Sequence, residues 1–260
     1  MTETSLICFR NTGYSSADRI VNQATEAGFF DRVKVFSEKD VSPLIKRHRI
    51  HFLLRKNLGF GTFLWKPYII QQYLESMKEG DFLVYADIGV HVHKAREAKF
   101  QSYIKTILEE GTALGAFEVG PAYPSHRFVT STAVMEYLPS FYGDGYPSVY
   151  AGLLMFKKTA LSQEICSDWL YLCEKYLPRY FSPFYRSRNE VIDFEGQDTD
   201  SGFLPLILKK RGGVSLFPGS DINLYNRNGM QLKHSTSQED YLSVNWSNLD
   251  GAAFSYRRDR

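Results

Sequence analysis

The sequence predicts an α/β fold in which a mostly parallel sheet is flanked by helices. Short apolar runs alternate with helical patterns along the first half of the chain, and the run at 82–86 contains only apolar and aromatic residues. Such an uninterrupted apolar strand is typical of a parallel sheet that is buried on both faces. No internal repeat, low-complexity tract or long linker divides the 260 residues, so we expect a single domain.

The first strand–helix–strand unit occupies residues 5–36. The apolar run 5–10 ends at Asn11-Thr-Gly13 and predicts a buried strand followed by a turn. A helix is expected to begin with Ser15 or Ser16 as its N-cap and to end at Gly28, before a second strand at 33–36. Two strands joined by a helix within about 30 residues indicate a βαβ unit, which makes the strands parallel.

The pattern continues through the rest of the chain. Pro67 suits the first turn of a helix that runs to about Lys78, and Glu79-Gly80 ends it. Further helices are expected at 98–110, 162–176 and 198–210, further strands at 82–86, 113–118 and 149–156, and a loop at 178–188. The tail from Asp221 onward shows no strong period.

The composition excludes several classes of protein. Thirty-one Lys and Arg against 29 Asp and Glu give a net charge of +2, which does not favour a nucleic-acid partner. No apolar run is long enough to span a membrane, and residues 1–5 lack the features of a signal peptide. Three cysteines, Cys8, Cys166 and Cys173, indicate neither a disulfide framework nor a zinc site. We therefore expect a cytoplasmic protein without a transmembrane segment.

Two charged residues stand where an α/β sheet binds ligands. Asp87, in Asp87-Ile-Gly89, follows the strand at 82–86, and open α/β sheets bind ligands at the carboxyl ends of their strands. Lys66 precedes Pro67 at a helix N-terminus, where the helix dipole and the ammonium both favour phosphate. The alternatives are a structural cap for Asp87 and a solvated surface position for Lys66.

Residues 59–90, GFGTFLWKPYIIQQYLESMKEGDFLVYADIGV, resemble the "GYGYWxWKP … GDxxxYxDAG" pattern of small GT-A glycosyltransferases of polysaccharide gene clusters and large DNA viruses. Residues 150–158 are similar to the family's "xAGxxxFxKT" strand, and residues 200–210 to its "DQSxxSLLxKK" helix. The resemblance covers about 6–210 and implies a GT-A-like, Rossmann-like sheet. It also implies a nucleotide-sugar-binding half at about 1–118 and an acceptor-binding half at about 119–260.

The resemblance implies transfer of a sugar from a nucleotide diphosphate sugar to a hydroxyl of a glycan acceptor. The donor-binding residues that we expect are Phe9, Arg10, Lys66, Asp87 and Gly89. Leaving-group charge is commonly neutralised by a divalent cation, Mn²⁺ or Mg²⁺.

The expected metal ligands are Asp87 and His234. The Asp-x-Asp motif of GT-A enzymes is Asp87-Ile-Gly89 in this chain, so other ligands must complete the metal shell. His234 resembles a late histidine that does so in some GT-A enzymes, and its alternative is a solvated position in a polar tail. His91 and His93 are further candidates if their segment is extended, because they would then share a face.

The catalytic candidates are Asp200 and Asp198. A base that accepts the proton of the acceptor hydroxyl is most often a carboxylate or a histidine. Asp200 matches the family's Asp-Gln-Ser position, but Thr199 and Ser201 replace the histidine and glutamine that are usual there. The alternative is that these aspartates cap the helix that follows.

The acceptor-binding candidates are Glu118, Arg127 and Gly152. Glu118 and Arg127 flank the turn at 120–125, where an ion pair between them is the structural alternative. Trp65 and Phe63 form either a platform for a base or sugar, or part of the core. Residues 180–188, rich in aromatic and basic side chains, fit either an acceptor clamp or a lid.

Two other functions remain open at this point. A nucleotide-sugar hydrolase or nucleotidyltransferase would use the same donor pocket without a sugar acceptor. A non-catalytic glycan-binding protein on a transferase fold would fit the missing second aspartate. Neither the sugar, the nucleotide base, the acceptor nor the stereochemistry follows from the sequence.

Overall fold

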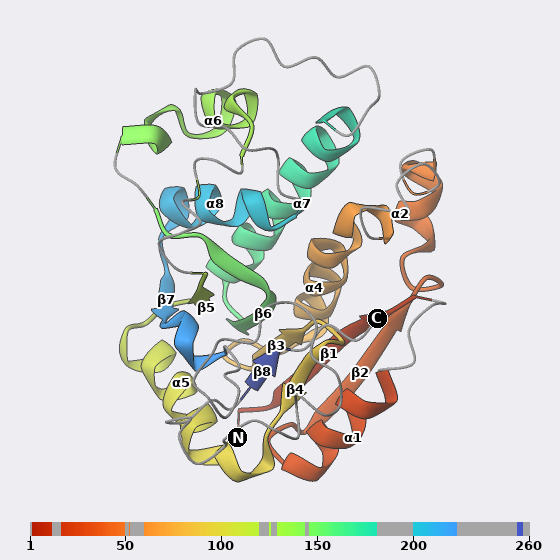
Figure 1. Ribbon diagram of the computed structural model, residues 1–260, viewed down its shortest axis with the longest axis vertical. Helices are drawn as coiled ribbons and strands as arrows, with labels where there is room; N and C mark the ends of the chain where they lie inside the picture. The colour runs from red at the N-terminus through yellow and green to blue at the C-terminus, as the bar shows by residue number, and fades with distance from the viewer. Residues whose placement is uncertain are drawn as a thin grey trace, which may run out of the picture.

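The structure is a computed structural model that describes residues 2–11, 17–49, 52, 60–119, 125, 129–143, 146–180, 200–222 and 254–256. At its centre is a six-stranded sheet with the strand order β2-β1-β3-β6-β5-β7 (Figure 1). The strands are β1 (Thr4–Arg10), β2 (Arg32–Ser37), β3 (Phe82–Ala86), β5 (Leu114–Glu118), β6 (Val149–Lys157) and β7 (Val214–Phe217). β6 is antiparallel to both of its neighbours, and the other adjacent pairs are parallel. The predicted mostly parallel sheet is confirmed.

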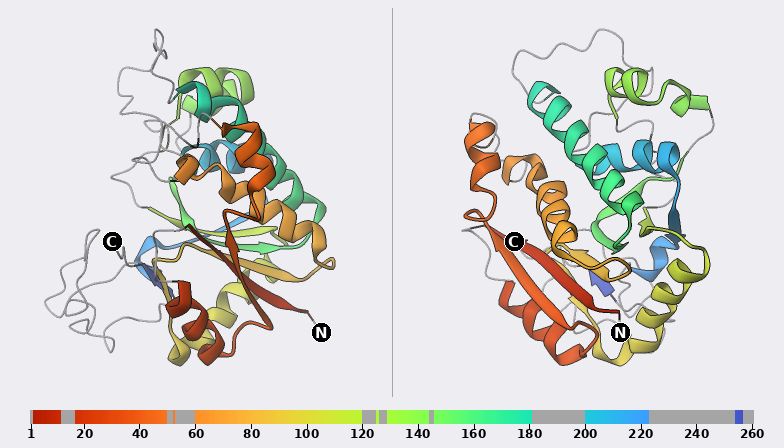
Figure 2. Two further views of the ribbon diagram at one scale, coloured as in Figure 1. Left: turned by 90° about the vertical axis from the view of Figure 1, so that its right-hand side faces the viewer. Right: turned by 180° about the vertical axis from the view of Figure 1, so that it is seen from behind.

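Helices cover both faces of this sheet (Figure 2). One face carries α2 (Ser42–Arg47), α4 (Trp65–Ser76), α6 (Ser131–Tyr137), α7 (Ala160–Tyr180) and α8 (Leu204–Arg211). The other face carries α1 (Ala17–Ala27) and α5 (Glu97–Glu109). Single turns of 3₁₀-helix lie at η2 (Phe60–Phe63), η3 (Lys94–Arg96), η5 (Pro139–Gly143), η6 (Ser201–Phe203) and η7 (Gly219–Asp221).

The central strands are apolar because each side of the pleat meets a different layer of helices. In β1, Ile7 packs into the cluster under α4 and α7, whereas Leu6 and Cys8 pack into the cluster with α1 and α5. In β3 the side chain of Tyr85 joins the first cluster and that of Val84 the second. This two-sided burial is the cause of the uninterrupted apolar run at 82–86.

Several predicted boundaries differ from the structure. α7 continues to Tyr180 through Pro178, where a loop was expected. A proline within a helix costs about 3 kcal/mol, but burying Tyr176 and Leu177 offsets this at about 1.5–3 kcal/mol for each side chain. The helix expected at 198–210 is the turn η6 followed by α8, which begins at Leu204. Ser15 and Ser16, the expected N-cap residues, lie outside the described residues.

Short elements absent from the prediction include α2, α6, β7 and a two-stranded sheet of β4 (Val90–Val92) and β8 (Phe254–Tyr256). β4 and β8 are antiparallel, with Val90 opposite Tyr256. The tail without a period thus contributes a strand that pairs with β4, the segment that follows Gly89. In the part of the chain described, no helix has both the length and the apolar surface that crossing a membrane requires.

A left-handed turn connects to the start of α4. Gly61, Thr62 and Phe63 all have positive φ, at 56°, 47° and 62°. A β-branched residue in this region is a genuine outlier, and the conformation costs a residue with a Cβ about 1–2 kcal/mol. Gly61 is required for a second reason, because a Cβ there would come within 2.2 Å of the Phe52 ring. The turn directs the side chains of Trp65 and Lys66 toward the sheet, where they contact Phe9 of β1 and Ala151 of β6.

This strain predicts an inverted stability order at Thr62. We expect the Thr62→Gly variant to be more stable than Thr62→Ala by about 1 kcal/mol, since glycine adopts positive φ without a penalty. Urea denaturation of the two variants measures this difference. Thr106, within α5, is the control, and there the alanine variant should be the more stable one. A Thr62→Ala variant more stable than Thr62→Gly would contradict the strain.

Candidate functional site

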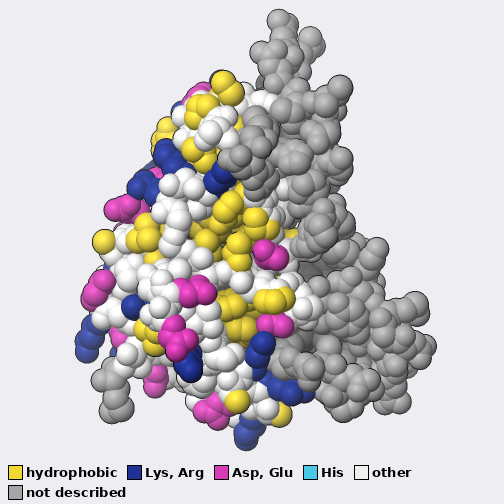
Figure 3. Space-filling model, turned by 90° about the vertical axis from the view of Figure 1, so that its left-hand side faces the viewer, with side chains coloured by type: hydrophobic (Ala, Val, Ile, Leu, Met, Phe, Trp, Pro, Cys, Tyr) yellow, Lys and Arg dark blue, Asp and Glu magenta, His cyan; other side chains and the backbone are white. Residues whose placement is uncertain are grey.

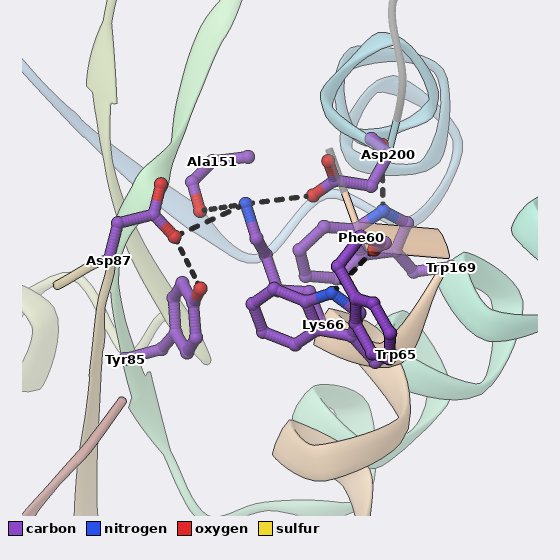
Figure 4. A network of polar contacts seen from close by, with 8 residues as sticks. All are labelled: Phe60, Trp65, Lys66, Tyr85, Asp87, Ala151, Trp169 and Asp200. Carbon is purple, nitrogen blue, oxygen red and sulfur yellow. Dashed lines mark hydrogen bonds and ion pairs between the residues drawn. The ribbon is translucent and has the colours of Figure 1, made fainter. Parts of the chain in front are cut away.

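The candidate site lies where β3 ends, and three distant parts of the chain meet there. Asp87 follows β3, Lys66 belongs to the first turn of α4, and Asp200 immediately precedes η6 (Figure 4). The backbone of Asp87 is fixed on both sides. Its N–H donates to the carbonyl of Gly152 at 2.8 Å, and its carbonyl accepts from the N–H of Val90 at 2.8 Å.

The ammonium of Lys66 joins the two carboxylates. Lys66 Nζ lies 3.0 Å from Asp200 Oδ2 and 3.5 Å from Asp87 Oδ1, and it donates to the carbonyl of Ala151 at 3.3 Å. The side chains of Lys66 and Asp200 are only 4% and 2% exposed, whereas that of Asp87 is 27% exposed. The cluster formed by Lys66, Asp87 and Asp200 therefore carries one positive and two negative charges in a largely dry environment.

The charges of this cluster stabilise one another. Burial alone would lower the pKa of Lys66, but the carboxylates of Asp200 and Asp87 outweigh it and raise that pKa above its ordinary value. The hydroxyl of Tyr85 donates to Asp87 Oδ1. Burial and the charge of Asp87 raise the pKa of Tyr85, so its phenol remains a donor. Lys66 is thus charged and Tyr85 neutral near pH 7.

Aromatic side chains hold the cluster from the helical side. Trp169 of α7, fully buried, donates its Nε1–H to the backbone carbonyl of Asp200 at 2.8 Å. The ring of Trp65 stacks on that of Phe9 with centroids 3.8 Å apart, and its Nε1–H donates to the backbone carbonyl of Phe60 at 2.9 Å. Phe9 and Trp65 are each 5% exposed, so both belong to the core. The ring centroid of Phe63 lies 5.1 Å from Lys66 Nζ, which is within range of a cation–π contact.

Gly152 provides space for Asp87 and does not itself offer a side chain. A Cβ at Gly152 would come within 2.7 Å of Asp87 Oδ2 and within 2.3 Å of the Tyr150 hydroxyl oxygen. The absence of a side chain at Gly152 therefore lets Tyr150 and the second oxygen of Asp87 occupy the same small region. Its predicted role toward an acceptor remains a prediction.

A clamp from α1 fixes the turn that carries Gly89. The guanidinium of Arg19 donates to the carbonyls of Ile88 and Val90. Gln23 accepts from the N–H of Val92 at 3.2 Å and lies 3.1 Å from His91 Nδ1. The geometry after β3 is therefore set by a helix that is distant in sequence.

Two other predicted residues, Arg10 and Glu118, interact with side chains outside this cluster. Arg10 is half exposed, 3.8 Å from Asp18. Glu118 ends β5 at an irregularity in the β5–β6 pairing and, together with burial, raises the pKa of Tyr146 to about 12. Outside the described residues lie Asp198, Arg127, His234 and the segment 181–188.

The side of the molecule that carries α5, β5 and β7 is mixed in character. Apolar side chains gather in the middle of this face, with acidic side chains among them (Figure 3). Leu108 of α5 is 50% exposed, and Val119, directly after Glu118, is 38% exposed. The predicted acceptor residue Glu118 is thus followed by an exposed apolar residue.

The metal expected from the sequence finds an incomplete ligand set among the residues that the structure describes. Oδ1 of Asp87 already accepts from Tyr85 and faces the ammonium of Lys66, and Gly89 offers no side chain. Within the described ranges, no group of three or more His, Cys, Asp and Glu is placed to hold a metal ion. Asp87 alone does not fit a divalent cation, which takes about six ligands.

His91 and His93 do share a face, as expected for an extended segment. Their rings are parallel within 10° with centroids 6.5 Å apart. His91 is buried on Gln23, and burial together with the charge of Arg96 lowers the pKa of His93 to about 4. His93 therefore remains neutral at and above pH 5.

Sequence reasoning missed the groups that orient these side chains, namely Tyr85, Trp169, Arg19 and Tyr150. Tyr85 had a usable signal, because it precedes Asp87 by two residues and so points to the same face of the strand. Trp169 and Arg19 had none, since their contacts connect positions 31 and about 70 residues apart.

Comparison with known proteins addresses the fold. No family model matches the sequence, and no curated protein matches it. A glycosyltransferase involved in glycosylation of the major capsid of PBCV-1 is 13% identical, with 97% of this chain and 91% of that chain covered and a TM-score of 0.51.

Two further solved structures have TM-scores below 0.5. The galactosyltransferase LgtC, in complex with donor and acceptor sugar analogues, is 15% identical over 98% of this chain and 87% of that chain, at 0.45. Mouse xyloside xylosyltransferase 1 is 11% identical over 98% and 97%, at 0.42. The likeness to the PBCV-1 enzyme supports a GT-A-like fold for this chain, and the sequence motifs remain a prediction.

The low pKa of His93 predicts a pH-dependent loss of stability. In the unfolded chain this pKa returns to about 6.5, so between pH 6.5 and 4 the unfolded state binds a proton that the folded state does not. Stability therefore falls as the pH is lowered through this window, by up to about 3 kcal/mol.

Urea denaturation at pH 7 and pH 4.5 checks this prediction. Between these values, the His93→Gln variant should lose about 2 kcal/mol less free energy of unfolding than the wild type. Lys105→Gln, at an exposed position of α5, serves as the control and should follow the wild type. Equal losses in His93→Gln and the wild type would contradict the assignment.

Proposed function

We propose that this chain is a glycosyltransferase that moves a sugar from a nucleotide diphosphate sugar to a hydroxyl of a glycan acceptor. The observation that carries the proposal is the pair of aspartates, Asp87 and Asp200, that share the ammonium of Lys66 at the end of β3. In an open α/β sheet, this edge is where ligands bind. The GT-A-like fold supports the same reaction class.

The charge of the cluster suits glycosyl transfer. The transition state resembles an oxocarbenium ion, so positive charge develops on the sugar ring. Lys66, Asp87 and Asp200 together carry a net charge of −1, which favours this positive charge in a poorly solvated site. Carboxylate oxygens also accept hydrogen bonds from sugar hydroxyls. A neutral sugar ring is therefore a better neighbour for this cluster than a phosphate.

Asp200 is our candidate for the group that acts on the acceptor or on the anomeric centre. In an inverting reaction its carboxylate would take the proton of the acceptor hydroxyl. In a retaining reaction it would stabilise the positive charge that develops on the sugar ring of the donor. The hydrogen bond from Trp169 fixes its backbone. Asp198 is the alternative base.

For the donor we propose contacts to Arg10, Asp87 and Gly89, which lie at the ends of β1 and β3 or directly after them. Phe9, the fourth predicted contact, instead packs in the core against Trp65. Mn²⁺ or Mg²⁺ would neutralise charge on the leaving diphosphate. Asp87 would be one ligand and His234 another, and the described residues do not complete the shell. Glu118, Arg127 and Gly152 are the proposed acceptor residues.

A thermal-shift panel of UDP, GDP, CMP and dTDP sugars, with and without Mn²⁺, tests the proposal. One nucleotide class should raise the unfolding midpoint by about 5 °C or more at saturation, because a ligand that binds only the folded state stabilises it. A larger shift with Mn²⁺ would support a metal-assisted donor site. Stabilisation by oligosaccharides but by no nucleotide sugar would instead indicate a glycan-binding protein.

Transfer assays with the donor so identified then test the aspartates. Asp87→Asn and Asp200→Asn should each reduce transfer by about 100-fold or more, since a neutral amide supports neither the positive charge nor proton transfer. Lys105→Met, at an exposed and distant position, should match the wild type. Donor cleavage that an acceptor does not accelerate would favour a hydrolase.

Gly152 and Gly115 provide a matched pair for separating site damage from loss of stability. Alanine at either glycine meets atoms within 2.8 Å, Asp87 and Tyr150 at position 152, and Phe217 and Ile107 at position 115. Both variants should lose about 1–3 kcal/mol of stability. Measured at a temperature where both are folded, Gly152→Ala should lose transfer activity and Gly115→Ala should retain it. Equal activities would remove Gly152 from the site.

A further inference from the structure

We propose that Lys66 is a positioning residue, which holds the carboxylates of Asp87 and Asp200 in place, and that its ammonium does not contact the donor diphosphate. This inference rests on the proposed function, because it assigns the two carboxylates to the sugar-transfer site. It replaces the role that the sequence predicts for Lys66, namely neutralisation of phosphate charge at a helix N-terminus.

The hydrogen-bonding capacity of the ammonium is fully used. A lysine ammonium has three N–H donors. Around Lys66 Nζ stand three acceptors, at 3.0 Å (Asp200 Oδ2), 3.3 Å (the carbonyl of Ala151) and 3.5 Å (Asp87 Oδ1). Figure 4 shows Asp200 on one side of the nitrogen, with Asp87 and Ala151 on the other. With the side chain 4% exposed, a phosphate would have to displace one of these partners to reach the nitrogen.

The position of Lys66 in the fold explains why one cation serves two carboxylates. Asp87 directly follows β3 of the sheet, whereas Asp200 lies on the helical side, where its carbonyl accepts from Trp169 of α7. α4 packs between them against α7, and Lys66 lies in its first turn. Lys66 thus bridges the sheet and the helical layer at the point where both present a carboxylate.

The ammonium also offsets the repulsion between the two carboxylates, which carry like charges in a poorly solvated site. Its loss would leave both charges without the cation that lies between them.

Binding of a nucleoside diphosphate separates a positioning role from a phosphate contact. The probes are UDP, GDP, CDP and dTDP in calorimetric titrations, and the one that binds the wild type is carried forward. For Lys66→Met we expect its Kd to stay within about threefold of the wild type, while kcat for transfer falls by about 100-fold or more. A Kd raised by about tenfold or more would show a phosphate contact, unless Asp200→Asn added to Lys66→Met restores it.

A conservative variant adds a readout that a merely structural lysine would not move. Lys66→Arg, which keeps the positive charge, should recover part of the kcat that Lys66→Met loses, while the Kd of the nucleoside diphosphate stays unchanged. A Lys66→Arg variant that binds the nucleoside diphosphate about tenfold more tightly than Lys66→Met would overturn the proposal.

A stability cycle covers the case in which Lys66→Met folds poorly. Removing the cation leaves two carboxylates without it, so the urea midpoint of Lys66→Met should be reduced at pH 7. Adding Asp200→Asn should restore most of the lost midpoint, whereas Lys105→Met should change nothing. A deficit that Asp200→Asn does not relieve would overturn the proposal.

These outcomes distinguish failure of the inference from failure of the proposed function. If no nucleoside diphosphate binds the wild type, the transferase assignment loses its donor. The stability cycle still measures whether Lys66 holds the carboxylates of Asp87 and Asp200 in place, because it requires no substrate. Binding with intact Kd in Lys66→Met, together with the predicted cycle, supports both.

Discussion

The ammonium of Lys66 between Asp87 and Asp200 is the contact on which the arrangement of the candidate site depends. Burying any one of these charges alone would cost several kcal/mol, so each is retained only because the others are present. The bridge also connects segments that the chain keeps far apart, the end of β3, the start of α4 and the beginning of η6. Displacement of any of them would separate the charges.

The sheet topology supplies the remaining contacts of this cluster. β6 runs antiparallel next to β3, which places the carbonyl of Ala151 at the lysine and the carbonyl of Gly152 at the backbone of Asp87. Gly152 then leaves space for the carboxylate and for Tyr150. The antiparallel strand β6 thus supplies two backbone carbonyls to the candidate site.

Local strain and remote clamps complete the positioning of the site. The left-handed turn Gly61–Phe63 sets the direction in which α4 starts, and burial of Thr62 holds it in that conformation. On the opposite face of the sheet, Arg19 fixes the carbonyls that follow Asp87. Residues in sparsely populated backbone regions concentrate at functional sites, where the surrounding structure over-determines them. In this chain the strained turn Gly61–Phe63 directly precedes the helix that carries Lys66.

The sequence alone determined the class of fold and the residues of the central cluster. Apolar runs, Gly28, Gly80 and Pro67 punctuate the chain locally, so most of the strands and helices follow from patterns of a few residues. Asp87, Lys66 and Asp200 were identifiable by residue type and by resemblance. Only the tertiary structure decided that Lys66 pairs with both aspartates, that Trp65 stacks on Phe9, and that a strand at 254–256 joins β4. These contacts connect residues far apart in sequence, and periodicity carries no information about which distant segments meet.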